Sequence, residues 1–414
     1  MDTGTTAFML ACIIGLTMMI PGLALFYGGM VSVKSSINMM MMTFGAVAVV
    51  GVLWVLFGYS MVFGDSYGDA GLLGSITEYA GLGEAIADGE VAVPLALFAV
   101  FQALFAGITV ALISGAVADR MKFGAWMIFA AIWAVLVYFP VAHWVFAFDA
   151  ADGSVIGGWI ANDLKAIDFA GGTAVHINAG AAALALAVIL GKRATWGQAP
   201  RPHNVPLTLL GAGLLWAGWY AFNGGSALAA NNASSVVMLT TFIATCAAIL
   251  AWLAVEQLRT GHTTGIGAAS GAIAGLVAIT PSCAAVSPMG SIVVGVVAGA
   301  LCQLAVGLKD RLGYDDTLDV VGVHLVGGII GTLMIGIVGN ADMPSGVDGL
   351  LYGGGLEQLG RQAAAVVAVL AYTLIVTAAI ALALKATIGL RVSPEDEESG
   401  IDSKLHRDPA YDLV

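Results

Sequence analysis

The sequence predicts an all-α polytopic membrane protein with eleven transmembrane helices. Hydrophobic residues make up 59% of the 414 residues and charged residues only 10%, whereas a soluble domain carries about 25% charged residues. The apolar residues gather in runs that are long enough to cross a bilayer, which takes about 20 residues per helix. Basic residues gather in every second loop between these runs. The net charge of −12, with no basic patch, excludes a nucleic-acid-binding protein.

Eleven apolar runs account for most of the chain. The first run follows no basic segment and is too long for the core of a signal peptide, so we expect it to be retained as a span. The predicted spans are 7–30, 37–63, 91–118, 123–147, 169–191, 204–222, 234–256, 264–280, 288–308, 319–339 and 362–390. Residues 1–390 therefore form the membrane domain, and residues 391–414 form a polar tail of mixed charge.

The basic residues give an independent test of this topology. Thirteen of the 15 lysines and arginines, Arg201 among them, fall in alternate loops or at and beyond the end of the last span, and only Lys165 and Arg361 fall on the other side. Loop 64–90, on that other side, carries six acidic residues and no basic residue. Because cytoplasmic loops of membrane proteins are enriched in Lys and Arg, we expect an outside N-terminus and a cytoplasmic C-terminus in the plasma membrane.

Eleven spans divide into five, five and one. Since five is odd, the second group of five enters the membrane in the opposite direction to the first. The sequence thus predicts an inverted repeat, about 7–191 and about 204–339, followed by an eleventh helix at about 362–390. Inverted repeats with a site at their interface are a recurring plan of transporters.

Glycine and cysteine patterns indicate packing rather than chemistry. Gly267, Gly271 and Gly275 are spaced four apart, as are Gly295 and Gly299, and small residues at this spacing let membrane helices approach closely. The four cysteines lie in or beside apolar runs without a CxxC spacing, so we expect neither a disulfide set nor a metal site.

Two histidines lie inside predicted spans. His176 is in span five, within DFAGGTAVHINAG, and His324 is in span ten, within DVVGVHLVGG. An ionisable side chain at membrane depth is costly and usually lines a cavity or a path. Because the two spans enter from opposite faces, we expect the two imidazoles to meet near mid-membrane, both neutral, with one donating and one accepting a hydrogen bond. The pattern favours a polar lane, and so transport, over the alternative of two packing histidines.

The other candidate residues have plain structural alternatives. Asp168 opens span five, where a carboxylate accepts hydrogen bonds from free backbone N–H groups at a helix start, and we expect Asp319 to do the same for span ten. Phe105 and Phe222 are core residues by composition alone, and Ser226 equally suits a helix-end hydroxyl. No His, Cys and carboxylate cluster has metal-ligand spacing and no nucleophile triad is present, so we expect neither an enzyme nor a cofactor site.

A specific pattern runs through five segments of the chain: IPGLALFYGGM (20–30), DFAGGTAVHINAG (168–180), GWYAFNGGSA (218–227), GAIAGLVAITP (271–281) and DVVGVHLVGGIIG (319–331). These segments resemble the ammonium transporter family, the Amt/Mep/Rh superfamily, on its bacterial Amt side. The resemblance extends to the start of the tail, GLRVSPEDEESGID. It implies eleven helices per subunit with a pore in each, a pseudo-twofold between spans 1–5 and 6–10, and a homotrimer.

The resemblance also implies roles for residues along the pore. His176 and His324 correspond to the twin pore histidines, and Phe105 and Phe222 to a stacked gate above them. The implied substrate is ammonium or ammonia, with methylammonium as an analogue. The implied partners are membrane lipid and a P-II-type signalling protein that blocks the pores from the cytoplasmic face. The aromatic residues implied to lie near the pore are Trp219 and Tyr138.

An external recruitment site for the cation is implied as well. Phe105, Ala170 and Ser226 correspond to this site, and Asp168 to the carboxylate that supports it. The family usually has a tryptophan shortly after the histidine of span four, but this chain has Phe146 there, followed by an insertion. Phe binds a cation less well than Trp does. The candidates for a substitute aromatic are Trp144 and Trp159.

Two other functions fit the same residues. One is a sensor that binds ammonium and signals through the tail with little flux, and the other is an Rh-like channel for another small neutral solute. Flux of labelled methylammonium separates a transporter from a sensor, and the acidic tail and bacterial-type motifs weigh against the Rh branch. Conduction of neutral ammonia and net transport of ammonium both remain compatible with the sequence.

Overall fold

The computed structural model describes residues 2–86, 93–197 and 202–411. The predicted start of span three at residues 91–92, Arg201 and the last three tail residues lie outside these ranges. Within them, ten helices are long and apolar enough to cross a membrane, and an eleventh apolar helix, Gly265–Ile279, is shorter. The prediction of an all-α polytopic membrane protein is confirmed.

Short breaks divide several of the first five spans. Span one consists of α1 (Thr3–Thr17) and α2 (Met19–Met30), and begins earlier than predicted because the Asp2 carboxylate caps its first turn. The elements that follow are α3 (Ser36–Leu53), α4 (Tyr59–Phe63), α5 (Leu95–Ile113), α6 (Phe123–Trp133), α7 (Phe139–Phe146), α8 (Trp159–Asn162) and α9 (Asn178–Leu190). Single turns of π-helix lie at Trp54–Gly58, Ala134–Tyr138 and Gly172–Ile177.

The later spans begin at α10 (Val205–Gly225). They continue with α11 (Asn232–Thr260), α12 (Gly265–Ile279), α13 (Pro288–Ala305), α14 (Leu308–Leu312), a π-turn at Val321–Leu325, α15 (Val326–Val338) and α16 (Glu357–Thr387). The tail carries α17 (Pro394–Ser399) and a π-turn at Asp402–His406. Short 3-10 segments lie at Val33–Ser35, Tyr67–Asp69, Ala80–Ile86, Ser114–Val117 and Leu350–Tyr352.

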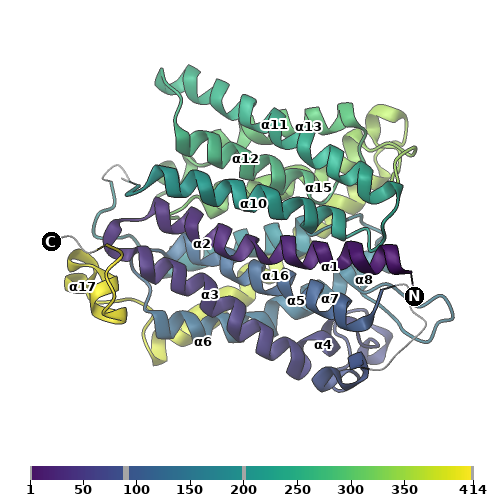
Figure 1. The fold of residues 1–414 in the computed structure, drawn as a ribbon, viewed down its shortest axis with the longest axis horizontal. Helices are drawn as coiled ribbons and strands as arrows, with labels where there is room; N and C mark the ends of the chain where they lie inside the picture. Colours follow the sequence, from purple (N-terminus) through teal and green to yellow (C-terminus); the bar gives the residue numbers. More distant parts are fainter. Residues whose placement is uncertain (1, 87–92, 198–201, 412–414) are drawn as a thin grey trace.

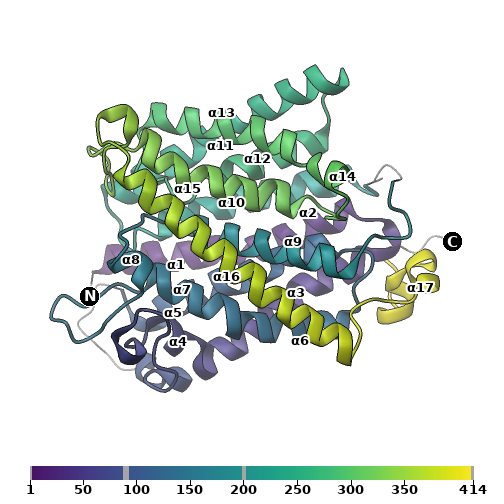
Figure 2. The same cartoon turned by 180° about the vertical axis from the view of Figure 1, so that it is seen from behind.

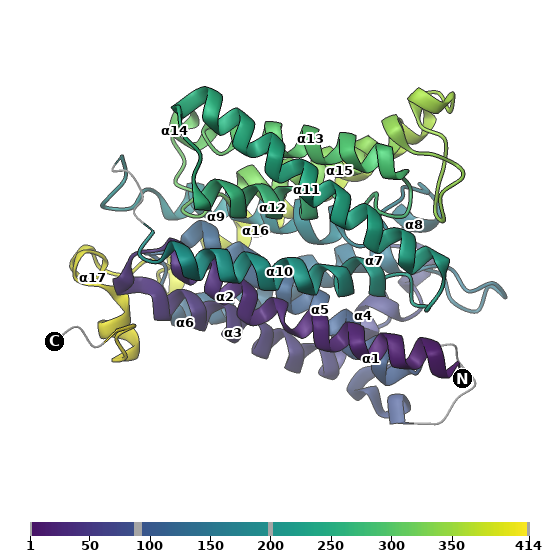
Figure 3. The same cartoon turned by 45° about the horizontal axis from the view of Figure 1, so that its top comes forward.

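The helices run along the long axis of the molecule, with α1 beginning at one end and α17 lying at the other (Figure 1). Opposite ends for these two elements are what an odd number of spans requires. On the reverse side, α16 runs obliquely across the bundle (Figure 2). The helices α10–α15 gather on one side of the bundle and α1–α7 on the other (Figure 3). The two groups meet where α2 packs against α10 and where spans five and ten contact each other.

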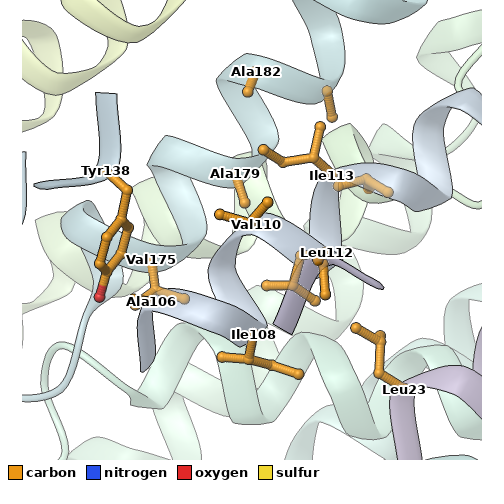
Figure 4. Packing of buried hydrophobic residues seen from close by; sticks show 14 of the residues in the cluster. Leu23, Ala106, Ile108, Val110, Leu112, Ile113, Tyr138, Val175, Ala179 and Ala182 are labelled. Carbon is orange, nitrogen blue, oxygen red and sulfur yellow. The ribbon is translucent and has the colours of Figure 1, made fainter. Parts of the chain in front are cut away.

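Small side chains let the central helices approach closely. Near the interior, Ala106 and Val110 of α5 lie beside Val175 and Ala179 of span five (Figure 4). These side chains are fully buried, and the small side chains of Ala106 and Ala179 allow the close approach of the two spans.

Glycines perform the packing role that their spacing predicts. A Cβ placed on Gly271 would lie 2.8 Å from the Cβ of Trp252, and one on Gly275 would lie 2.6 Å from the Cβ of Ala248. Real Cβ atoms do not approach other carbons this closely, so α12 can lie against α11 only because these positions lack a side chain.

The tail docks on one end of the bundle rather than extending into solvent. The Asp402 carboxylate accepts hydrogen bonds from the backbone N–H groups of Ile37 and Asn38, at 2.9 and 2.8 Å, and so caps the start of α3. His406 Nε2 lies 2.9 Å from Asn38 Oδ1, and Val392 N–H donates to the Arg120 carbonyl at 3.0 Å. The tail therefore joins the starts of spans two and four.

Buried charges occupy the same end. Arg193 contacts Asp315 at 2.9 Å and Asp119 at 3.3 Å. The Arg120 side chain is fully buried and donates to Thr317 Oγ1 and to the Asp315 carbonyl, and burial lowers the pKa of Arg120 to about 10, so that it stays charged near neutral pH. The loops rich in basic residues thus gather at the end that holds the tail, whereas Lys165 and Arg361 lie at the opposite end, near α8 and the start of α16.

Candidate functional site

The two histidines of the predicted lane face each other in the centre of the bundle. His324 Nδ1 lies 3.3 Å from His176 Nδ1, and the two rings are 5.4 Å apart at an interplanar angle of 28°. Only 1% of His176 and 4% of His324 is exposed. Because a neutral imidazole has one donor and one acceptor nitrogen, this contact requires one ring to donate and the other to accept. His176 Nε2 is buried and has no hydrogen-bond partner among the described residues.

Each histidine lies in a π-turn, Gly172–Ile177 for His176 and Val321–Leu325 for His324. Turns of this type are rare in helices and recur at functional sites. Span five approaches its partner closely, since a Cβ on Gly180 would lie 2.5 Å from the backbone nitrogen of Leu325. The extra residue of each turn changes the direction in which the side chains before and after it project.

Asp168 holds the start of span five. Its carboxylate accepts hydrogen bonds from the backbone N–H groups of Gly171, Gly172 and Thr173 at 2.8, 2.6 and 2.7 Å, and also from the Thr173 hydroxyl. A further N–H, that of Ala174, lies at 3.3 Å. Gly171 has φ +115°, a backbone conformation that a side chain would oppose. The capping role predicted for Asp168 is thus present, and it fixes the segment that leads to His176.

The expectation that Asp319 caps span ten is wrong. Its carboxylate lies 2.6 Å from Lys309 Nζ instead, and its own backbone adopts φ +62°. Asp316 supplies the cap, because its Oδ2 accepts from the Val321 N–H at 2.7 Å. Burial raises the pKa of Asp316 to about 6. Two aspartates three residues apart look alike in the sequence, and only the turn between them decides which one reaches the helix start.

Phe105 and Phe222 form a stacked pair above the histidines. Their ring centroids are 3.9 Å apart and the rings are 20° from parallel. Phe222 also lies 6.3 Å from the His176 ring. Phe105 lines a wide cavity on one side of the pair and Phe222 lines a narrow one on the other. The two rings therefore lie between these two cavities.

The wide compartment, which we call the outer cavity, has a volume of about 620 Å³. It opens at the end of the bundle opposite the tail. The Ser226 hydroxyl donates to the Phe222 carbonyl at 2.9 Å, which leaves its oxygen able to accept from a ligand. The residues that line the outer cavity are Phe63, Phe98, Gln102, Phe105, Val145, Phe146, Phe148, Ala161, Lys165, Ala166, Ile167, Asp168, Phe169, Ser226, Leu228 and Ser345. Ala170 is buried and does not line it.

The aromatic wall of the outer cavity consists of phenylalanine rings. Phe146 lies edge-on to Phe105, with ring centroids 6.4 Å apart. Trp144 and Trp159 pack against each other at 5.9 Å and do not line the cavity; the Trp144 indole donates to the Leu72 carbonyl. Sequence reasoning missed Phe148, which lines the cavity and is 70% exposed, because it lies in an insertion that the five family-like segments do not reach.

The narrow compartment, the inner cavity, is apolar apart from the histidines. It holds about 10 Å³ of free volume, which is room for about one water-sized molecule. The Trp219 ring stacks on His176 at 5.4 Å, and the Trp219 indole donates to Thr280 Oγ1 at 2.8 Å. The residues that line the inner cavity are Met19, Leu23, Phe26, Ile108, Leu112, Val175, His176, Leu215, Trp219, Phe222, Ile273 and His324.

Tyr138, the other aromatic residue expected near the pore, lies beside the path rather than on it. It is buried in a π-turn and interacts with the Thr109 side chain, and it lines neither cavity. Across the described ranges there is no group of three or more His, Cys, Asp or Glu side chains that could hold a metal ion, and the four cysteines are unpaired thiols.

Comparisons with known proteins agree with this geometry. The model of the Ammonium Transporter Family matches residues 7–411. An ammonium transporter of Mycobacterium tuberculosis strain H37Rv is 55% identical, over all of this chain and 91% of that protein. The crystal structure of Saccharomyces cerevisiae Mep2 matches at a TM-score of 0.84 with 34% identity, over 95% of this chain and 91% of that chain. A structure titled "Sensor Amt Protein" matches at 0.87 with 28% identity, over 96% and 97% of the two chains. On the full-length family match and the 55% identity, the chain belongs to the ammonium transporter family.

Proposed function

We propose that this protein transports ammonium across the membrane through a pore within the single chain. The observation that carries the proposal is the contact between His176 and His324 at 3.3 Å, inside a narrow apolar cavity and below the stacked Phe105 and Phe222 rings. The outer cavity recruits the cation, the phenylalanine pair acts as the gate, and the two histidines form the lane.

Each compartment suits one form of the substrate. Ammonium carries a full charge that is costly to bury in an apolar lane. In the outer cavity, the Phe105 and Phe146 rings and the Ser226 oxygen replace part of its hydration through cation–π attraction and hydrogen bonding. The inner cavity is apolar and admits one water-sized molecule, so it favours neutral ammonia. His176 Nε2 is left to hydrogen bond with this molecule, and the shared Nδ1 contact offers a route for a proton.

Exclusion of potassium is a test of the roles proposed for the two cavities. Potassium has no proton to release, and the lane offers few oxygen ligands to replace its hydration shell. The experiment is a current measurement on a solid-supported membrane after a concentration jump into proteoliposomes. An ammonium jump should evoke a current and a potassium jump should not. If ammonium evokes no current, uptake of labelled methylammonium distinguishes electroneutral conduction from a sensor that carries little flux.

The orientation and assembly follow from the same reasoning. We infer that the outer cavity faces the outside and that the tail is cytoplasmic, because the basic loops gather at the tail end. We also infer that residues 7–191 and 204–339 form an inverted repeat, which the paired π-turns at His176 and His324 support. The family resemblance supports a homotrimer and a P-II-type signalling protein that docks on the cytoplasmic face.

One prediction concerns the recruitment aromatic. Phe146→Trp should lower the apparent KM for methylammonium, because the ring at position 146 lines the outer cavity and Trp attracts a cation more strongly than Phe does. The gain should be about two- to five-fold, as expected from a cation–π difference of about 0.4–1 kcal/mol. Trp144→Phe serves as the control, since Trp144 lies off the cavity. An unchanged KM in Phe146→Trp would show that this ring does not bind the cation.

A second prediction concerns the tail. Deletion of residues 391–414 should lower transport while the trimer persists, because the tail ties the starts of spans two and four to the end of span eleven. Asp402→Ala should reproduce part of the loss, since it removes the cap on α3. Glu395→Ala, which alters an exposed acid of α17, is the control. Full activity of the truncated protein would exclude a coupling role for the tail.

A further inference from the structure

Lys165 brings a positive charge into the cavity that receives a cation. It lines the outer cavity together with Ser226 and Asp168, and it is the one basic residue among the described residues that do so. Its side chain is exposed. Of the 15 basic residues in the chain, only Lys165 and Arg361 fall on this side of the predicted topology. A positive charge at this place repels a cation that enters the cavity, so it does not help to attract the substrate.

The backbone around Lys165 is held firmly. Two buried glutamines of α16 bind the segment: Gln358 Nε2 donates to the Lys165 carbonyl at 3.4 Å, and Gln362 both accepts from the Ile167 N–H and donates to the Ile167 carbonyl at 2.7 Å. Lys165 itself adopts φ +56°, a left-handed conformation that is uncommon for a residue with a side chain. The segment thus places the root of the lysine side chain on the cavity wall.

Among the side chains that the structure describes, none neutralises the Lys165 ammonium. It makes no ion pair and no side-chain hydrogen bond with the residues of 2–83, 93–197 or 202–411. Among the described lining residues, Asp168 is the one acid, and its oxygens already accept hydrogen bonds from the start of span five. Arg361, by contrast, is paired with Glu357 of the same helix turn at 2.5 Å.

We propose that Lys165 is a resident cation that competes with the substrate for the outer cavity and so sets the apparent affinity for ammonium. The proposal rests on the proposed function, since it concerns the entrance of the same pore. The side chain ends in a primary ammonium, the same donor group that methylammonium presents. Its charge opposes a second cation in the cavity that both would occupy.

The test is uptake of labelled methylammonium by intact cells that make the full chain and have no other ammonium transporter. Lys165→Gln removes the charge, and Lys165→Glu reverses it. We expect KM to fall about two- to five-fold in Lys165→Gln, as befits the loss of one unit charge from the wall of a solvent-accessible cavity, and to fall further in Lys165→Glu. Lys165→Arg keeps the positive charge, so its KM should stay close to that of the unaltered protein. The differences should shrink as added salt shortens the Debye length.

Arg361→Gln is the matched control, because it removes the same charge from the same end without altering the cavity lining. Its KM should equal that of the unaltered protein. Asparagine adopts a left-handed backbone more readily than most residues do. Lys165→Asn therefore provides a second neutral variant if Lys165→Gln does not reach the membrane. Equal KM values for the unaltered protein and the neutral variants at low salt overturn this inference alone. Absence of methylammonium uptake by the unaltered protein overturns the proposed function instead.

Discussion

Replacing either pore histidine with alanine should abolish or sharply reduce the current that an ammonium jump evokes. Each imidazole supplies a polar atom in an otherwise apolar cavity, and the pair is joined by a single contact, between His324 Nδ1 and His176 Nδ1. Alanine at position 176 or 324 leaves the other ring without its hydrogen-bond partner and breaks the proton route. We expect a loss of about ten-fold or more, the size of effect that one lost hydrogen bond to a buried reacting group gives.

The same variants should also discriminate less well against potassium, because alanine widens the lane. The measurements are ammonium- and potassium-evoked currents on a solid-supported membrane, with assembly checked by size-exclusion chromatography in detergent. His262→Ala is the control, since His262 is exposed and its Nδ1 lies 3.1 Å from the carbonyl of the neighbouring Thr260. If His176→Ala and His324→Ala assemble and keep both the ammonium current and potassium exclusion of the unaltered protein, the histidines serve only packing and the lane must be abandoned.

Asp168→Ala should cause a comparable loss by a different route. The carboxylate holds the first N–H groups of span five and the Thr173 hydroxyl. Without it, these partly buried donors are unsatisfied, at a cost on the order of 3 kcal/mol or more, and the turn that carries His176 loses its fixed start. We expect a lower melting temperature and at least a ten-fold smaller ammonium current.

Asp168→Asn keeps the shape but has only one acceptor oxygen, so its melting temperature should lie between those of the unaltered protein and Asp168→Ala. Asp163→Ala, at an exposed acid of the same loop region, should change neither property. A normal current from Asp168→Ala would mean that the start of span five holds its geometry without the carboxylate.

Hydropathy predicted the helical membrane architecture because it is a property of long segments. Each of the eleven predicted spans overlaps a helix of the structure, including the shorter Gly265–Ile279. The ends were less accurate, as at α11, which extends to Thr260 because its polar last turn continues beyond the apolar run. Caps such as Asp2 depend on local backbone geometry, which composition does not record.

The candidate site was predictable in part. Membrane depth alone identified His176 and His324 as unusual, and opposite spans predicted that they would meet. Phe105 and Phe222 lie 117 positions apart in the sequence and carry no local signal, so their stacking was expected only from the family resemblance. The mistaken cap at Asp319 has a related cause, since one turn of backbone decides whether Asp316 or Asp319 reaches the helix start.

The π-turns at the two histidines have a consequence for how such a lane persists over evolution. A turn with one extra residue rotates the helix beyond it by about 100° relative to an uninterrupted α-helix. The meeting of His176 and His324 therefore depends on the number of residues in spans five and ten as well as on their identity. Gain or loss of a single codon there would leave the hydropathy of the span almost unchanged and still turn the imidazole away from its partner. In an alignment of related sequences, an insertion or deletion inside either π-turn would therefore indicate that the two imidazoles no longer face each other, even where both histidines are retained.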